Sequence, residues 1–448
     1  MADIQAFRGW RYDLAKAGSL GDLVAPPYDV IDSQSQDQLY DRSPYNVTRL
    51  ILNRGDDLLG DQTVYDRAAE HLKHWRRDGV LVEENAGTVY VYHQAFEHEG
   101  QSFTRRGFIA RVKLEPLGTG TIYPHEQTHS AAKEDRFKLM SACQANLSPI
   151  FGIYPDQENI AQEALEAAVE DRTPLTAIDG QGVRHELWRV TDANAIAAAA
   201  NLLGSVPTYI ADGHHRYETS CAIRDQRRQA EGIEGEHPVD YTMMMCISMH
   251  DPGMVVLPTH RLFRQVQPIA STDLISSLGD AFTCEVAAQG ISAAETMWEE
   301  IAVEDQQSTL GFYCRKDDTW VVARMTEAGA AMLSDVASDQ SDQWRGLGVS
   351  ILHELVITKL LGYSDLPAPR YVHDTMEVVE GLQAGDSTGR DATGQVGDGG
   401  SFELACLVLP ASVEHVTQIS QNGERMPAKS TYFYPKLLSG LVINPLQQ

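Results

Sequence analysis

Between Gln157 and Met249 the sequence alternates helical and strand patterns, and this alternation is the feature that most constrains the fold. An alanine-rich helical stretch and a helix from about His215 to Ala230 separate the short apolar segments. The predicted strands in this region are Glu186–Val190, Thr208–Ile210 and Tyr241–Met249. Such alternation is typical of proteins in which helices cover a sheet. The sequence therefore predicts a mixed α/β (α+β) fold, with the strand order left open.

The flanking segments carry a similar mixture of patterns. Val64–Arg77 places Ala68, Leu72 and Trp75 on one side and predicts an amphipathic helix. Thr88–Phe96 and Phe103–Leu114 are rich in β-branched and aromatic residues, and they predict a hairpin that turns near Glu99-Gly100. Further predicted elements are the strands Phe7–Arg11, Asn46–Leu52, Ile150–Tyr154 and Phe402–Leu409, a hairpin of Thr309–Cys314 with Trp320–Met325, and the helices Leu347–Leu361 and Val413–Ser420.

A chain of 448 residues is long enough for two or three domains. The patterns suggest an N-terminal α/β lobe over residues 1–150 and a central α/β region over 151–380. The third segment, 381–448, begins with the glycine-rich stretch Gly381–Gly400, which predicts a loop or insertion, and its end is expected to pack back on the core.

The charge balance limits the possible partners. Lys and Arg total 36 against 63 Asp and Glu, a net charge of −27 at pH 7. A protein that grips a nucleic acid polymer needs a basic stripe, and the sequence has no local block of Lys and Arg to form one. A small anion could still bind where a few cations and backbone amides overcome the surrounding field.

The absence of recognisable targeting signals predicts a cytoplasmic location. The first residues lack a basic stretch followed by an apolar one, and no run approaches the 18 or so apolar residues of a membrane span. The six cysteines are scattered without a C-x-x-C pair, which fits reduced thiols. We expect a cytoplasmic protein with no membrane partner, and the oligomeric state is left open.

The strongest chemical signal is the segment Asp212-Gly213-His214-His215-Arg216. A short apolar strand runs into the turn pair Asp212-Gly213, and a helical stretch follows at once. The first amides of such a helix have no intrahelical acceptor and point beyond the strand end. The imidazoles of His214 and His215 and the guanidinium of Arg216 suit phosphate oxygens, and Asp212 could hold a Mg²⁺ ion that shares them. The alternative is that Asp212 caps the helix, Gly213 makes the turn, and the basic residues are solvated or form salt bridges.

The segment Tyr123–His129 contains an H-E-x-x-H pattern formed by His125, Glu126 and His129. In a zinc hydrolase this pattern lies on a buried helix, but Pro124 and the polar Gln127 and Thr128 argue against one here. A general base beside a phosphoryl site is a better use for Glu126. A helix-capping role for this carboxylate is the alternative.

Met426–Lys436 is the second cationic segment. Lys429, Ser430, Thr431 and Lys436 supply two ammonium groups and two hydroxyls that suit an anion in an acidic protein. An edge strand with solvated lysines is the alternative.

Two further segments supply candidates for the wall of a substrate pocket. The prolines of Ala25–Asp29 make a rigid turn that either places Tyr28 and Asp29 at a pocket rim or is purely structural. In the predicted strand Asn46–Leu52, the side chains of Asn46 and Arg49 are expected on opposite faces.

The string Asp-Gly-His-His-Arg resembles the phosphate motif of the ParB/sulfiredoxin-like superfamily, and especially that of its ADP-dependent free-serine kinases. This resemblance implies a phosphate-binding unit of that type embedded in a larger two-lobed protein, with ADP or ATP as co-substrate and Mg²⁺ as cofactor.

A second resemblance covers nearly the whole chain, to the family called domain of unknown function 1015. The segments that carry it are Val24–Ile31, Asn46–Leu50, His125-Glu126, Asp135-Arg136, Asn146–Phe151, Asp212–Arg216 and Met426–Lys436. It implies a cytoplasmic microbial protein, and it adds His125, Thr128, Asp135 and Arg136 to the pocket candidates.

Together these signals predict an enzyme of phosphotransfer or phosphate-ester chemistry. Glu126, His214 and His215 would be catalytic, and Asp212–Arg216 with Lys429–Lys436 would bind a nucleotide or phosphate. By analogy with the serine kinases, the substrate would be a small hydroxylated metabolite such as serine or phosphoserine. The alternatives are a nucleotide-binding regulatory switch without catalysis, a metal-dependent hydrolase that uses His125–His129, and a ligand-binding scaffold.

Overall fold

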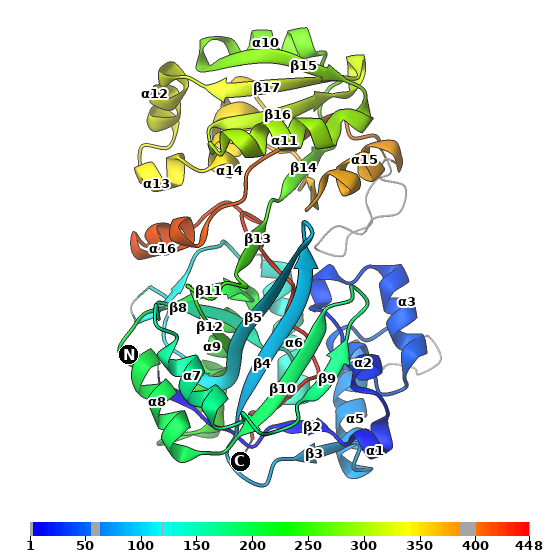
Figure 1. The fold of residues 1–448 in the computed structure, drawn as a ribbon, viewed down its shortest axis with the longest axis vertical. Helices are drawn as coiled ribbons and strands as arrows, with labels where there is room; N and C mark the ends of the chain where they lie inside the picture. The colour runs from blue at the N-terminus through cyan, green and yellow to red at the C-terminus, as the bar shows by residue number, and fades with distance from the viewer. Residues whose placement is uncertain (1–2, 55–62, 119, 129, 385–399, 448) are drawn as a thin grey trace. The chain divides into compact units, whose positions relative to one another are not determined.

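The structure is a computed structural model, and it describes residues 3–54, 63–118, 120–128, 130–384 and 400–447. These residues form two compact units. Unit 1 contains residues 1–124, 128–255 and 435–448, and unit 2 contains residues 125–127 and 256–434. The expected mixed α/β class is confirmed in both units, where helices and sheets occur together (Figure 1).

Each unit is assembled from separate stretches of the sequence. The main sheet of unit 1 takes strands from both 1–150 and 151–380, because β5 pairs with β12 and β4 pairs with β10. Compact units are held together by such long-range strand pairs, which composition along the chain does not reveal. The ranges of the strands of this sheet are, in spatial order, β6 (Ile122–Pro124), β11 (Thr208–Asp212), β8 (Ile150–Tyr154), β12 (Tyr241–Ser248), β5 (Gln101–Lys113), β4 (Val89–His98), β10 (Arg184–Val190) and β9 (Leu175–Ile178), with β1 (Ile4–Gln5) beside β5.

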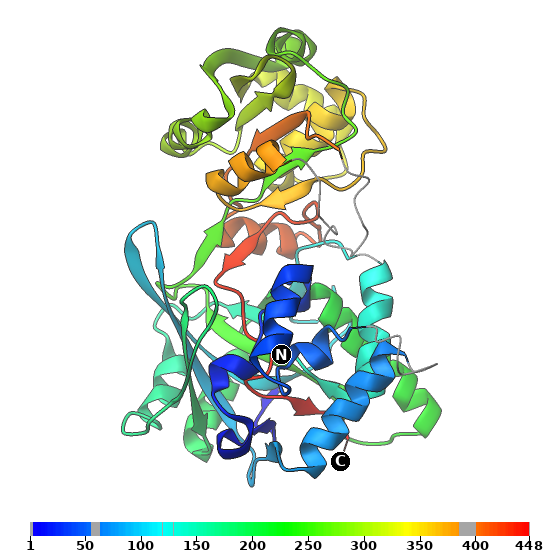
Figure 2. The same cartoon turned by 90° about the vertical axis from the view of Figure 1, so that its right-hand side faces the viewer.

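Strand β11 lies near one edge of this sheet, parallel to β6 and antiparallel to β8. The predicted hairpin is confirmed as β4 and β5, the long blue ribbon pair of Figure 2. Its turn residues Glu99 and Gly100 have φ of 50° and 72°, which suits a tight two-residue hairpin turn. Helices α7 (Ile160–Ala167) and α8 (Ala193–Leu203) share an apolar core with β4, β5 and β12.

Helix α5 (Val64–Arg77) has the predicted bounds, and Ala68, Leu72 and Trp75 are buried on its inner face. It contacts α6 (Ser130–Cys143), which in turn contacts α9 (His214–Glu231). Because Thr63 and Asp66 form a capping box at the start of α5, its first amides are satisfied locally.

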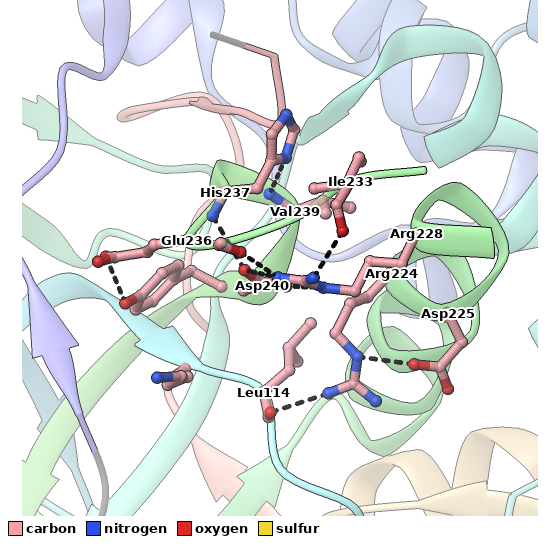
Figure 3. Close-up of polar contacts among 12 residues, drawn as sticks. Leu114, Arg224, Asp225, Arg228, Ile233, Glu236, His237, Val239 and Asp240 are labelled. Atoms are coloured by element: carbon pink, nitrogen blue, oxygen red, sulfur yellow. Dashed lines mark hydrogen bonds and ion pairs between the residues drawn. The ribbon is translucent and has the colours of Figure 1, made fainter. Parts of the chain in front are cut away.

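Helix α9 is fixed to the sheet through its C-terminal half (Figure 3). Arg228 donates through Nε and Nη2 to the two carboxylate oxygens of Asp240, at 2.6 and 2.5 Å. Arg224 donates to the carbonyl of Leu114 at 2.8 Å. The pairing lowers the pKa of the Asp240 carboxyl despite its burial, so the ion pair holds the helix at neutral pH.

Unit 2 is built on an antiparallel six-stranded sheet (Figure 1). Its core contains Trp320, Met297 and Leu382, from a strand and from two helices packed on the sheet. The strands in spatial order are β15 (Phe282–Gln289), β17 (Thr319–Met325), β16 (Thr309–Cys314), β19 (Leu404–Leu407), β14 (His260–Phe263) and β18 (Arg370–Val372), and the helices include α10 (Ser271–Leu278), α11 (Ala294–Glu304), α12 (Glu327–Val336), α15 (Thr375–Ala384) and α16 (Val413–Gln421).

Several predicted elements are wrong or shifted. The expected strand Asn46–Leu52 is instead the short helix α4 (Thr48–Ile51), because the Asn46 side chain accepts a hydrogen bond from the Thr48 amide and turns the chain. The expected strand Phe7–Arg11 is displaced to β2 (Trp10–Tyr12). The expected α-helix Leu347–Leu361 is largely a π-helix over Ile351–Leu360.

The predicted loop Gly381–Gly400 is only partly within the described chain. Helix α15 continues to Ala384, so the first four residues of that stretch are helical. Residues 385–399 lie outside the described residues. No helix in the described part of the chain combines the length and the apolar character needed to cross a membrane.

Candidate phosphate-binding site

The junction between β11 and α9 is built around Gly213. Its φ of +91° lies in the left-handed region, and α9 begins at the next residue. A Cβ atom at this position would lie 2.9 Å from Cζ of Arg216, closer than ordinary packing permits. Both the turn and the close approach of the guanidinium therefore require glycine.

Arg216 is held against this turn by two acceptors. Its Nη2 donates to Oδ2 of Asp212 at 2.5 Å, and its Nη1 donates to the carbonyl of Pro149. The side chain is 10% exposed. A guanidinium fixed in this way keeps its orientation without having to be ordered by a ligand.

Lys436 approaches the same carboxylate from the C-terminal end of the chain. Its Nζ lies 2.8 Å from Oδ1 of Asp212, and the lysine side chain is 12% exposed. The structure thus brings together Asp212, Arg216 and Lys436 in unit 1, three residues that the sequence nominated from two separate segments.

Two residues that were not predicted from the sequence hold Lys436 in place. Arg105 on β5 donates to the carbonyl of Pro435 and, at 3.1 Å, to Oε1 of Gln94. Gln94 on β4 donates to the carbonyl of Lys436 at 3.0 Å. Both side chains are fully buried, so the hairpin holds the segment that carries the ammonium group.

Burial lowers the pKa of Arg105 to about 10, and the nearby charge of Asp212 opposes this shift. The guanidinium remains a cation at neutral pH. Arg216 and Lys436 contact the Asp212 carboxylate directly, and the buried charge of Arg105 interacts with Asp251 and, more weakly, with Asp212. The available signal in the sequence was the pair of adjacent arginines, Arg105-Arg106, within the predicted hairpin strand.

The start of α9 adds backbone donors to this charge. Gly213 is the N-cap residue and offers no side chain to accept from the first amides of the helix. The dipole of an 18-residue helix favours a negative charge at this end. His214 is buried and His215 is half-buried. The junction can therefore accept an oxyanion such as a phosphate.

The arrangement fits Mg²⁺ less well than it fits an anion. Both oxygens of Asp212 contact a cationic side chain, Arg216 or Lys436. Among the described residues, no group of three or more His, Cys, Asp or Glu side chains is placed to hold a metal ion. Asp212 would have to release one cation before it could bind Mg²⁺ directly.

Thr128 lies beside α9. Its hydroxyl donates to Oε2 of Glu218 at 2.8 Å, and Lys133 donates to the same oxygen at 2.9 Å. Glu218 follows Arg216 on the first turns of the helix, so the structure places this predicted pocket residue against α9.

The candidates Tyr28, Asp135 and Arg136 form a second contact group in unit 1. The Arg136 guanidinium lies 3.8 Å from the centre of the Tyr28 ring, pairs with Asp135 and donates to the carbonyl of Ile51 at 2.9 Å. Asp29 lies in the short 3-10 turn that begins at Tyr28. These contacts fix the Pro-Pro turn against α6.

Asn46 and Arg49 make contacts that shape the local chain. Asn46 is fully buried and donates to the carbonyls of Asp22 and Val24, at 2.8 and 3.2 Å. Arg49 donates to the carbonyl of Tyr40 at 2.9 Å. The asparagine amide is therefore occupied in holding its own loop.

The remaining candidates lie in unit 2. His125 is fully buried, and its Nε2 lies 3.0 Å from the Thr431 hydroxyl. Oε1 of Glu126 accepts from the backbone amide of Lys429 at 2.7 Å, and Lys429 has a φ of +55°. The Ser430 hydroxyl donates within the same turn to the carbonyl of Pro427 at 2.5 Å.

Glu126 and His125 thus hold the turn that carries Lys429. His129, the last residue of the H-E-x-x-H pattern, lies outside the described residues. The structure consequently divides the predicted site residues into a group around Asp212 in unit 1 and a group around Glu126 in unit 2.

Solved structures with some similarity include a free serine kinase in complex with AMP, which is 10% identical with a TM-score of 0.32, covering 70% of this chain and 84% of that one. A conserved hypothetical protein from Pyrococcus furiosus is 11% identical with a TM-score of 0.32, covering 71% and 89%. C-terminally truncated SbnI from Staphylococcus aureus is 10% identical with a TM-score of 0.32, covering 75% and 87%. Similarity at this level does not establish the function of this chain.

No curated protein sequence matches the chain. One family model does, described as a protein of unknown function (DUF1015), and it matches residues 4–350. The matched range includes the Asp212–Arg216 segment and ends before Met426–Lys436. On this match, the chain belongs to the DUF1015 family.

Proposed function

We propose that unit 1 binds the phosphate groups of a nucleotide at the β11–α9 junction, and that the protein uses this site for phosphotransfer. The observation that carries the proposal is the pairing of both Asp212 oxygens with cations, from Arg216 at 2.5 Å and Lys436 at 2.8 Å. A doubly charged phosphate would be a stronger acceptor for these two donors than the Asp212 carboxylate is.

A phosphate at this point would also meet the first amides of α9 and the positive end of its dipole. Arg216 already lies at the junction, so on binding it would exchange one acceptor, Asp212, for the phosphate while its bond to the Pro149 carbonyl remains. Within an acidic chain of net charge −27, such a local concentration of cations is what a small anion requires.

The reaction we assign is transfer of a phosphoryl group from the nucleotide to the hydroxyl of a small metabolite. Serine is the first metabolite to test, because the Asp-Gly-His-His-Arg string resembles the phosphate motif of free-serine kinases. In this scheme one imidazole of the pair His214 and His215 takes the hydroxyl proton, the hydroxyl oxygen gains the phosphoryl group, and the nucleotide leaves one phosphate shorter. The other imidazole would stabilise the charge on the phosphates, and any Mg²⁺ would enter bound to them.

Binding and turnover are tested separately. Calorimetry with ADP, ATP and AMP measures affinity for the wild type and for Arg216→Met. Phosphorus NMR then follows each nucleotide with serine and Mg²⁺, and AMP with phosphoserine for the reverse direction. We expect binding that Arg216→Met abolishes, and a new phosphate ester signal. If no nucleotide binds, or if the variant binds equally well, the site assignment fails.

A nucleotide-controlled switch is the second candidate, and one observation favours it. The Asp212–Lys436 ion pair joins the β11–α9 junction to the C-terminal segment of unit 1. A phosphate that took Lys436 away from Asp212 would change how this segment is held. Binding without turnover, together with altered hydrogen exchange in residues 435–447, would favour the switch over the enzyme.

A further inference from the structure

A second group of cations in unit 1 lines a cavity of about 190 Å³. Its wall carries three arginines, Arg11, Arg172 and Arg189, next to Trp188 and Thr173, and two leucines complete it. None of these residues belongs to the Asp212–Arg216 segment or to Lys436. The cavity therefore needs an explanation of its own.

Two of the guanidinium groups are held in place by one buried carboxylate. Arg11 lies on β2, which pairs with β3 (Leu81–Glu83), and Arg189 lies on β10. Glu84 accepts from Nε of Arg11 at 2.6 Å and from Nη1 of Arg189 at 3.3 Å, and its side chain is 8% exposed. The carboxylate thus fixes one edge of the Arg11 guanidinium, and it contacts one edge of that of Arg189, whose side chain is 49% exposed.

The third arginine, Arg172, is an exposed residue whose contacts are to backbone groups. Nη1 of Arg172 donates to the carbonyl of Arg189 at 3.2 Å, and Nε1 of Trp188 donates to the carbonyl of Arg172 at 2.9 Å. A guanidinium has about five N–H donors. Within the described chain, each of the three arginines uses only one or two of them.

The local charge contrasts with that of the whole protein. Three guanidinium groups face a cavity beside one carboxylate, in a chain that carries 27 more negative than positive charges. Like charges held this close repel one another, and an anion between them relieves the repulsion. Arginine is the residue whose planar fork matches the oxygens of phosphate and carboxylate groups.

We propose that this cavity binds a small doubly charged oxyanion, either a phosphate or a dicarboxylate. Its volume equals that of roughly six water molecules at about 30 Å³ each, which suits a compact ion. Drug-sized ligands usually occupy about 300 Å³ or more, so a whole nucleotide is too large. The site is separate from the proposed nucleotide site and does not depend on it.

The test measures binding of orthophosphate and of succinate to the full chain by calorimetry at constant ionic strength. All variants are made in an Arg216→Met background, so that the β11–α9 junction does not contribute. Arg172→Gln is the main variant, because this arginine pairs with no carboxylate in the described chain. Arg189→Gln is the second, and Arg184→Gln, on the same strand with a 57% exposed side chain paired to Glu186, is the matched control.

We expect at least one of the two ions to bind, and Arg172→Gln and Arg189→Gln each to weaken binding by about tenfold or more. The control should bind as the parent does. Binding of phosphate alone identifies a phosphate site, and binding of succinate alone a dicarboxylate site. Absence of binding by both ions, or equal affinity in the parent and in Arg172→Gln, overturns the proposal.

Trp188 provides a local reading of the same event. Its indole lines the cavity, so the bound ion should change its fluorescence, and Trp188→Phe should remove that change while calorimetric binding persists. A calorimetric signal that survives in Arg172→Gln without any Trp188 response would place the ion elsewhere and would contradict the assignment.

Discussion

The ammonium of Lys436 lies 2.8 Å from Oδ1 of Asp212, so the last residue of β11 is paired with a side chain from the C-terminal segment. Arg216 takes the other oxygen of the same carboxylate. The contact joins the two cationic segments that the sequence singled out. Replacing residues at this contact should therefore change phosphate binding while the protein still folds.

Lys436→Met should weaken ADP binding by about tenfold or more, because a charge-assisted hydrogen bond contributes roughly 1.5–3 kcal/mol. Asp212 keeps its bond to Arg216, so the fold should persist. Calorimetry measures the affinity. Lys138→Met is the matched control, since Lys138 on α6 is 51% exposed and, among the residues that the structure describes, pairs with Glu134 one turn away. Equal affinity in both variants would mean that Lys436 does not contact the phosphate.

Gly213→Ala should destabilise the protein more than Gly232→Ala, at the opposite end of the same helix. Both glycines have positive φ, +91° and +62°, so both alanines incur backbone strain of about 1 kcal/mol or more. Only at Gly213 does the new methyl group also meet the Arg216 guanidinium, whereas Gly232 has open space around it. Urea unfolding and ADP titration of the two variants measure the difference. Loss of affinity in Gly232→Ala as well would show that helix strain, and not contact with Arg216, controls binding.

The parts of the fold that were predicted are those with local signals. The α5 period, the β4–β5 turn and the strand–turn–helix around Gly213 each depend on neighbours in the sequence. The error at Asn46 has a local cause as well. The Asn46 side chain accepts a hydrogen bond from a nearby backbone amide, and this bond favours a helical turn where the apolar alternation predicts a strand.

The candidate site was predicted only in its charged residues. The sequence drew attention to Asp212, Arg216 and Lys436 because cationic segments stand out in an acidic chain. Gln94 and Arg105 gave no such signal, because they bond carbonyl groups that are far away in the sequence. Nothing near Gln94 indicates that it will meet Lys436. The arginine cavity was missed for the same reason, because its walls come from β2, from β10, and from β9 with the chain just before it.

Arg105→Met should lower the free energy of unfolding by about 2–4 kcal/mol, since it removes the charge-assisted bonds to Gln94 and to the carbonyl of Pro435. It should also raise hydrogen exchange in the segment after Pro435 and weaken ADP binding through the misplaced Lys436. Lys113→Met, on the same strand with a 50% exposed side chain, is the control. A destabilised variant with wild-type exchange in that segment would contradict the positioning role.

Unit 2 should lose stability as the pH falls below about 6.5. Burial and the Arg261 charge together lower the pKa of His260 and of His353 to about 3, and at His260 the neighbouring His373 adds to the effect. His353 accepts from Nε of Arg261 at 3.2 Å, which requires a neutral ring. Between pH 6.5 and about 3 the unfolded chain binds these protons and the folded chain does not, so unfolding becomes easier as the pH falls.

Each of these two histidines should contribute roughly 1 kcal/mol per pH unit over that window. Urea unfolding at pH 7, 6 and 5 measures the slope. His353→Gln preserves an acceptor for Arg261 but cannot titrate, so its stability should depend less steeply on pH. His74→Gln, at an exposed position on α5, should keep the wild-type slope. If His353→Gln keeps it too, the buried ring is protonated in the folded state or does not pair with Arg261 in solution.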